Sequence, residues 1–123
     1  MELNYDNLLE VMLQRSVHFR KAYDIEIKKD NIDKQSGMHT VFSLVFVPLF
    51  IKAIKENDQK LISELALLVD EMERSDDVLV QEVSGFTIIE ALCDEFNNDV
   101  LSKVLLNESK KTMEEIREYI PER

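Results

Sequence analysis

A helical segment in the middle of the chain that is apolar on nearly every side constrains the fold most. From Met38 to Ile54 almost no polar face remains when the residues are placed on a helix. A helix that is apolar all round is enclosed by neighbours on several sides. Pro48 removes one backbone donor within this segment and is predicted to kink it.

The rest of the chain has few residues that make turns. Its 123 residues include only two Gly and two Pro, which favours long helices over many short strands. Apolar residues make up 45% and charged residues 33%, a balance typical of a globular chain. The length fits a single helical domain over residues 1–123.

Helical spacing and capping residues predict the remaining elements. A first helix is expected over Tyr5–Ala22 with Asp6 as its N-cap, then a loop or frayed helix over Tyr23–Ile27 and a loop over Lys28–Gly37. Further helices are expected after the caps Asp58, Ser75-Asp76-Asp77, Asn97-Asn98-Asp99 and Asn107, with Pro121 ending the last. On the helix that ends near Phe96, the predicted inward residues are Leu79, Val83, Phe86, Ile89, Leu92, Cys93 and Phe96.

The breaks between these helices are short, so consecutive helices should be antiparallel neighbours. The sequence therefore predicts an all-α fold of five or six antiparallel helices. It leaves open whether they form a compact bundle or a curved, HEAT-like helical layer.

The acidic residues are concentrated in one third of the chain. The net charge is -10, and residues 58–99 carry twelve acids against two bases, Lys60 and Arg74. Acids and bases balance on both flanks, eight and eight over residues 1–57 and five and five over residues 100–123. Closely spaced like charges cost stability, whereas a local negative field accelerates encounter with a basic protein.

Five of these acids surround one predicted turn and are the main candidates for partner contacts: Asp70, Glu71, Glu73, Asp76 and Asp77. Asp94, at the far end of the following helix, is a further candidate. The alternative interpretation is that these acids are only helix caps and solvated faces, since Asp76 and Asp77 suit a helix N-terminus.

Glu82 and Glu90 fall on the apolar side of the same predicted helix, near Phe86. A carboxylate there has to be paired, hydrogen-bonded or open to a partner. One hypothesis is that each pairs with a lysine or a backbone donor of another helix. The other is that Phe86, Glu82 and Glu90 form an interface, because an aromatic residue among acids suits recognition of a basic protein.

Sequence signals for other functions are weak. The two histidines, His18 and His39, and the single cysteine, Cys93, form no metal-binding or nucleophile motif, so neither metal nor cofactor is expected. Bases are too few and too scattered for direct nucleic-acid binding. The run Val41–Ile51 is too short to span a bilayer, and the N-terminus lacks signal-peptide regions, so a cytoplasmic protein is expected.

Three segments resemble a known class of proteins: Pro48–Ile54, Val80–Leu92 and Leu105–Lys110. They are similar to small helical immunity proteins of bacterial toxin–immunity pairs, including contact-dependent growth inhibition systems, some of which have a HEAT-like layer. The resemblance implies a stoichiometric inhibitor of a cognate toxin. Many such toxins are nucleases, which are basic because they hold phosphates.

The leading hypothesis is therefore an immunity protein, not an enzyme, that neutralises a basic toxin domain of the nuclease type and is a monomer or weak dimer when free. One alternative is a generic helical adaptor or scaffold, including a homodimer formed through Met38–Ile54. A third hypothesis is an enzyme that uses carboxylates with His18 or His39.

Overall fold

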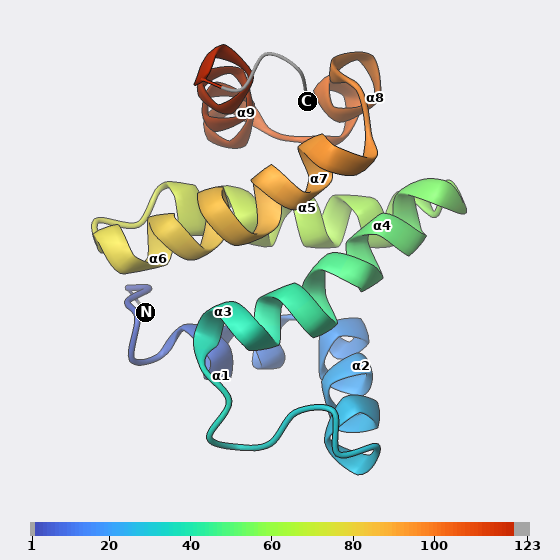
Figure 1. Cartoon of the computed structure of the whole chain (residues 1–123), viewed down its shortest axis with the longest axis vertical. Coiled ribbons are helices and arrows are strands. Elements are labelled where there is room, and N and C mark those ends of the chain that lie inside the picture. Colours follow the sequence, from blue (N-terminus) through green and yellow to red (C-terminus); the bar gives the residue numbers. More distant parts are fainter. Residues whose placement is uncertain (1, 120–123) are drawn as a thin grey trace.

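The fold is built around the helix formed by the apolar central segment. In the computed structural model, which describes residues 2–119, this helix comprises α3 (Met38–Val41), the π-helical stretch η1 (Phe42–Phe46) and α4 (Val47–Lys55). It crosses the middle of the molecule, with other helices above and below it (Figure 1). The predicted enclosure of this segment is only partly confirmed: its aromatic residues are buried, but 39% of the helix Met38–Lys55 is buried in all and Leu44 is 48% exposed.

Four phenylalanines form the centre of the core. Phe42, Phe46 and Phe50 come from this helix and Phe19 from a preceding one, and all four are fully buried. Their contacting rings have centroids 5.2 to 6.1 Å apart, in tilted or edge-on pairs that suit aromatic packing. The cluster joins the N-terminal helices to the centre of the fold.

The predicted irregularity at Pro48 takes the form of a π-helical stretch just before it. The Val47 N–H donates to the carbonyl of Phe42, five residues earlier rather than four. Since proline has no N–H and its ring clashes with the carbonyl of residue i−4 in a regular α-helix, the wider turn accommodates it. The helix changes direction between α3 and α4 (Figure 1).

The predicted single helix over Tyr5–Ala22 is wrong, because the chain breaks at Ser16. Two helices form instead, α1 (Leu8–Arg15) and α2 (Val17–Lys28). Ser16 is extended, with φ −130° and ψ 110°, and its Oγ accepts a hydrogen bond from the Phe19 N–H at 3.1 Å. A serine in this role is a common helix N-cap.

Two smaller predictions in the same region also need correction. The N-cap of α1 is Asn7 rather than Asp6. Residues 23–27 are neither loop nor frayed, since α2 continues through them to Lys28. The predicted loop that follows, up to Gly37, is confirmed from Lys29 onward.

The later helices begin at three of the predicted caps. Asp58 precedes α5 (Gln59–Glu73), Asn97 precedes α8 (Asn98–Val104), and Asp77 precedes the helix that follows α5. That helix comprises α6 (Val78–Glu82), the π-helical stretch η2 (Val83–Ile89) and α7 (Glu90–Glu95), and α9 (Asn107–Tyr119) is the last. The predicted stop at Pro121 lies outside the described residues.

The π-helical stretch η2 changes which side chains face the core. The Glu90 N–H donates to the Gly85 carbonyl, five residues earlier, so the helix turns less per residue here than an α-helix does. Val83, Ile89, Leu92 and Cys93 are buried as predicted, whereas Leu79 is 49% and Phe86 68% exposed. The predicted inward position of those two residues is therefore wrong.

Seven helices and no strands make up the described part of the chain when α3–η1–α4 and α6–η2–α7 are each taken as one. Figure 1 shows them in tiers: α1 and α2 at one end, the two long kinked helices with α5 in the middle, and α8 and α9 at the other end. The all-α prediction is confirmed, but the predicted number of helices is too low because of the break at Ser16.

The helix Met38–Lys55 is long and apolar enough to cross a membrane by length and composition alone, with a mean hydropathy of 1.5 over 18 residues. The sequence-based argument that the apolar run Val41–Ile51 is too short to span a membrane therefore does not apply to the whole helix. Its burial is more informative, because Phe42, Phe46 and Phe50 pack into the core. The core helix of a soluble protein can pass the same test of length and composition.

Candidate protein-binding face

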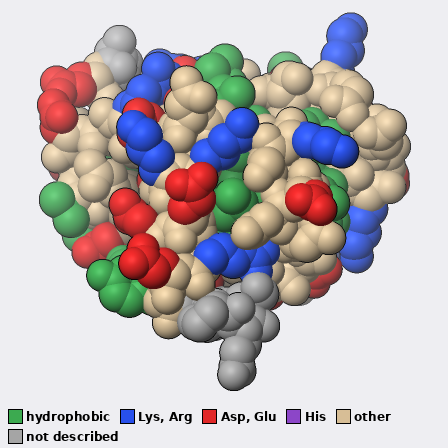
Figure 2. All heavy atoms as spheres, turned by 90° about the horizontal axis from the view of Figure 1, so that it is seen from above, with side chains coloured by type: hydrophobic (Ala, Val, Ile, Leu, Met, Phe, Trp, Pro, Cys, Tyr) green, Lys and Arg blue, Asp and Glu red, His purple; other side chains and the backbone are tan. Residues whose placement is uncertain are grey.

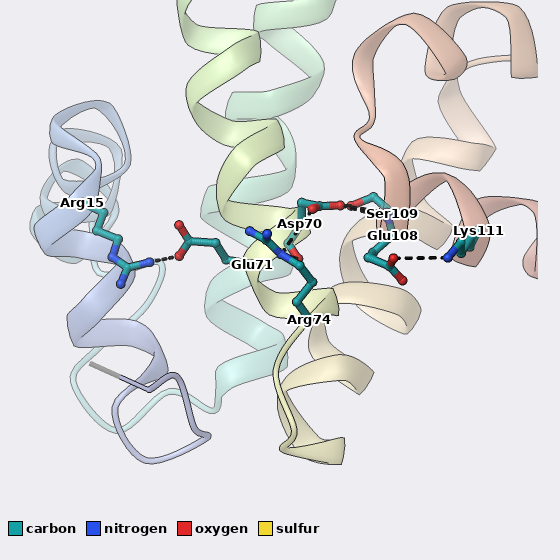
Figure 3. Close-up of polar contacts among 7 residues, drawn as sticks. All are labelled: Arg15, Asp70, Glu71, Arg74, Glu108, Ser109 and Lys111. Carbon is teal, nitrogen blue, oxygen red and sulfur yellow. Dashed lines mark hydrogen bonds and ion pairs between the residues drawn. The ribbon is translucent and has the colours of Figure 1, made fainter.

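The acidic turn between α5 and α6 does not form the open negative patch that the sequence predicts. Asp70 is only 6% exposed. Its Oδ1 accepts hydrogen bonds from the backbone N–H groups of Glu108 and Ser109, each at 3.1 Å, and from the Ser109 hydroxyl at 3.2 Å (Figure 3). Asp70 thus caps α9 from a different helix, and its burial leaves little of its carboxylate for a partner to contact.

Arginines neutralise two acids of this turn. Arg15 of α1 forms an ion pair with Glu71, and the Arg74 Nε lies 3.4 Å from Asp70 Oδ2 (Figure 3). Asp76 is exposed, but the shallow hollow that it lines also contains Arg15 and Arg74. The turn is therefore of mixed charge.

Asp77 holds the N-terminal segment in place. Its Oδ1 accepts from the Leu79 N–H at 3.0 Å, and its Oδ2 accepts from the Tyr5 N–H at 2.8 Å. Both oxygens are thus used within the chain. The interpretation of Asp77 as a helix cap fits these contacts better than a partner-binding role does.

Glu73, another acid of this turn, lines a hollow next to α9. It is half-buried, and its Oε1 accepts a hydrogen bond from the Thr112 hydroxyl of α9. Burial raises the pKa of Glu73 above its ordinary value of 4.5, and the nearby charges of Asp70 and Glu115 raise it further, while the hydroxyls of Ser84 and Thr112 lower it.

The other predicted contacts do come together, around Phe86. Two hollows flank this exposed ring, and Phe86 and Glu90 line both. The α9 hollow, about 520 Å³, lies between α6–η2 and α9, and the α3 hollow, about 560 Å³, lies between α3–η1 and η2–α7. We call the surface formed by these two hollows and Phe86 the Phe86 face.

Apart from His39, the described acidic and basic residues that line the Phe86 face are all acids. The acids that line the hollows are Glu73, Glu82, Glu90, Asp94 and Glu115, and none of the described lining residues is Lys or Arg. Glu90 and Asp94 also have interactions within the chain. The two hollows thus join exposed apolar groups to negative charge.

Several residues of this face are not predicted from the sequence. In the α9 hollow these are Val78, which is 62% exposed, together with Glu115, Ile116 and Tyr119. In the α3 hollow they are His39, Leu44 and Thr87. The His39 Nδ1 lies 2.5 Å from the Thr87 Oγ1, which links α3 to η2 beside the hollow.

The end of the molecule that carries α8 and α9 has mixed charge outside the α9 hollow. Figure 2 shows the end that carries α8 and α9, where Lys and Arg side chains are interspersed with Asp and Glu. This agrees with the five acids and five bases of residues 100–123. The acids of the Phe86 face are therefore not part of a uniform negative coat.

A serine, a histidine and a glutamate also meet near the N-terminus, but not in a catalytic arrangement. The Ser16 Oγ donates to Glu64 Oε2 at 2.6 Å, and the His18 Nδ1 lies 3.2 Å from the same oxygen. Both groups contact the carboxylate, and Ser16 is fully buried as a helix cap. Nucleophilic catalysis would need the histidine to accept the serine proton.

Within the described residues, no group of His, Cys, Asp and Glu has a geometry that could hold a metal ion. No family model, curated protein or solved structure matches the chain. The function therefore has to be argued from the Phe86 face itself.

Proposed function

We propose that this protein is an immunity protein that binds and neutralises a cognate basic toxin domain, of the nuclease type, through the Phe86 face. The observation that carries the proposal is the 68% exposure of Phe86 between two hollows whose described lining residues include several carboxylates but no Lys or Arg. Exposed aromatic residues within a partly desolvated rim commonly dominate the energy of protein–protein binding.

Charge complementarity supports a basic partner. Nuclease domains present Lys and Arg to hold phosphates, and an acidic inhibitor competes for the same surface. Glu82 and Glu115 belong to different helices, yet both line the α9 hollow beside Phe86. The negative potential thus arises from the fold and is not confined to one acidic segment.

The resemblance to small helical immunity proteins agrees with this proposal and extends it to the fold. The stacking of helix pairs in tiers (Figure 1) supports a HEAT-like layer rather than a simple bundle. The compartment expected for such an inhibitor is the cytoplasm, where the toxin would act.

The homodimer alternative that uses Met38–Ile54 has less support. Most of the apolar side chains of this helix lie in the core, and among its large apolar residues Leu44 is prominently exposed, at 48%. A generic adaptor function is not favoured by any particular contact within the described residues. An interface confined to this helix would have little apolar surface to use.

Genetic neighbourhood and survival test the proposal. Toxin and immunity proteins of this kind are encoded side by side, so the domain encoded by the adjacent gene is co-expressed with this chain in a bacterial host. We expect wild-type chain to restore growth and to co-purify with the domain in equal amounts. A toxic neighbour that the chain neither binds nor silences would refute the proposal.

A further inference from the structure

The α9 hollow combines exposed aromatic rings with carboxylates. Phe86 is 68% and Tyr119 85% exposed, and both residues line this hollow. Three of its acids come from three different helices: Glu73 from α5, Glu82 from α6 and Glu115 from α9. Its volume of about 520 Å³ lies in the range of natural ligand sites, so it has room for a long side chain of a partner.

Two of these carboxylates are available to a partner. Within residues 2–119, the side chains of Glu82 and Glu115 form no hydrogen bond or ion pair. The hypothesis that Glu82 pairs with a lysine or a backbone donor of another helix therefore finds no supporting contact in this part of the chain. Glu90 also lines the hollow but interacts within the chain, so recognition by the hollow does not depend on it.

The charges and walls of the hollow favour an organic cation as its occupant. Burial raises the pKa of Glu73 most, and the like charges of Asp70 and Glu115 raise it further. A positive group relieves this repulsion, because an opposite charge stabilises ionised carboxylates. The described residues include no cluster with the geometry of a metal site. Val78 and Ile116, which also line the hollow, suit the alkyl part of an organic cation better than a hydrated ion.

We propose that the α9 hollow takes an arginine side chain of a basic protein, whose guanidinium pairs with Glu82 and Glu115 and stacks on the Phe86 ring. A guanidinium is planar, binds carboxylates through two parallel hydrogen bonds and stacks on aromatic faces. The ammonium of lysine is a compact, strongly hydrated charge and gains less from an aromatic wall. The inference rests on the proposed function for the source of the arginine, which is the basic toxin domain.

A peptide titration tests this recognition without the toxin. The isotope-labelled full chain is titrated in NMR with the peptide acetyl-Gly-Arg-Gly-amide, and with counterparts that carry lysine or citrulline, the neutral isostere of arginine. We expect the arginine peptide to shift the amide signals of Gly85, Thr112 and Ile116, which line the hollow. The citrulline peptide should bind at least ~10-fold more weakly, because it lacks the charge-assisted hydrogen bonds, and the lysine peptide should also bind more weakly.

Matched variants separate the hollow from the general negative charge. Glu82→Gln with Glu115→Gln removes the two available carboxylates and should weaken binding of the arginine peptide at least ~10-fold. Glu114→Gln with Glu118→Gln removes the same charge from exposed positions of α9 outside the hollow and should weaken it less than about twofold. The NMR spectra verify that each variant folds. Equal effects of the two pairs would overturn the inference, as would lysine or citrulline peptides that bind as tightly as the arginine peptide.

The inference and the proposed function can fail separately. If the domain encoded by the adjacent gene is bound and silenced but the arginine peptide leaves the signals of the hollow unmoved, the inference is wrong and the proposed function stands. If the peptide binds in the hollow but that domain is toxic and is neither bound nor silenced, the proposed function is wrong. The hollow then still recognises arginine, on a basic protein other than this toxin.

Discussion

At the scale of single residues, the acids of the α5–α6 turn divide into structural and exposed groups. Asp70 is buried and caps α9, whereas Asp76, six residues later, is exposed. The sequence cannot separate them, because both are acids near the end of a helix. The difference arises from the docking of α9, which brings its N-terminal N–H groups to Asp70.

Replacement of Asp70 tests this division. Asp70→Ala removes the acceptor of three hydrogen bonds and leaves the first N–H groups of α9 without their cap, so we expect a loss of about 2 kcal/mol in the free energy of unfolding. Urea denaturation measures it. Asp76→Ala is the matched control and should change stability by less than about 0.5 kcal/mol. Equal effects of the two substitutions would contradict the assignment.

Glu73 gives a prediction about pH. Because burial raises its pKa above 4.5 in the folded state, the folded protein binds this proton more tightly than the unfolded chain does. The ionised Glu73 carboxylate therefore lowers the free energy of unfolding once the pH rises through 4.5 toward the raised pKa of the folded state. At lower pH, where Glu73 is protonated in both states, this loss is absent.

Glu73→Gln removes that cost and keeps an oxygen for the Thr112 hydroxyl. We expect the variant to be more stable than wild type at pH 7, with the difference shrinking as the pH falls toward 4.5. Thermal unfolding over this pH range measures the difference. A stability difference between variant and wild type that does not change with pH, or a variant that is less stable at pH 7, would show that burial does not dominate the pKa of Glu73.

At the scale of elements, the sequence predicts the helices better than their irregularities. The caps Asp58, Asp77 and Asn97 and the apolar spacing locate α5, the α6–α7 helix and α8. The break at Ser16 is not predicted because apolar residues continue on both sides of it, and the Ser16 hydroxyl donates to Glu64, which is 48 residues away. Such a contact has no local signature.

The exposure of Phe86 likewise depends on an element that spacing alone does not indicate. A helical wheel at 100° per residue places Phe86 with Val83 and Ile89, whereas the π-helical stretch η2 rotates it outward. Glu82, Phe86, Glu90 and Asp94 can be selected from the sequence. Their neighbours on α9 and α3 cannot, since they are brought together only by packing.

Gly85 tests how η2 is stabilised. It is buried in the middle of the stretch, and a Cβ built there would lie 3.5 Å from Thr112 Cγ2, an ordinary contact distance. Glycine within a helix costs about 0.5–1 kcal/mol relative to alanine, so Gly85→Ala should raise stability by a similar amount. Thermal unfolding checks this. A clear loss of stability would mean that α9 must approach η2 more closely than this distance allows.

At the scale of the whole molecule, the uneven charge should govern how fast partners meet. If the acids of the Phe86 face steer a basic protein, its association rate should fall steeply as salt is added. Glu115→Gln, which removes a charge from the α9 hollow, should slow association and flatten the salt dependence. Glu114→Gln, at the neighbouring exposed position, lies outside the hollow and should have a smaller effect. Stopped-flow fluorescence measures both.

One binding measurement tests the central claim most directly. It compares how tightly two matched variants of this chain bind the toxin domain encoded beside it. Phe86→Ser removes the exposed ring between the two hollows, and Leu79→Ser removes a 49% exposed apolar group that lines neither. Isothermal titration should show Kd raised at least ~10-fold by Phe86→Ser and less than about twofold by Leu79→Ser. Equal affinities for wild type and Phe86→Ser would contradict binding through this face.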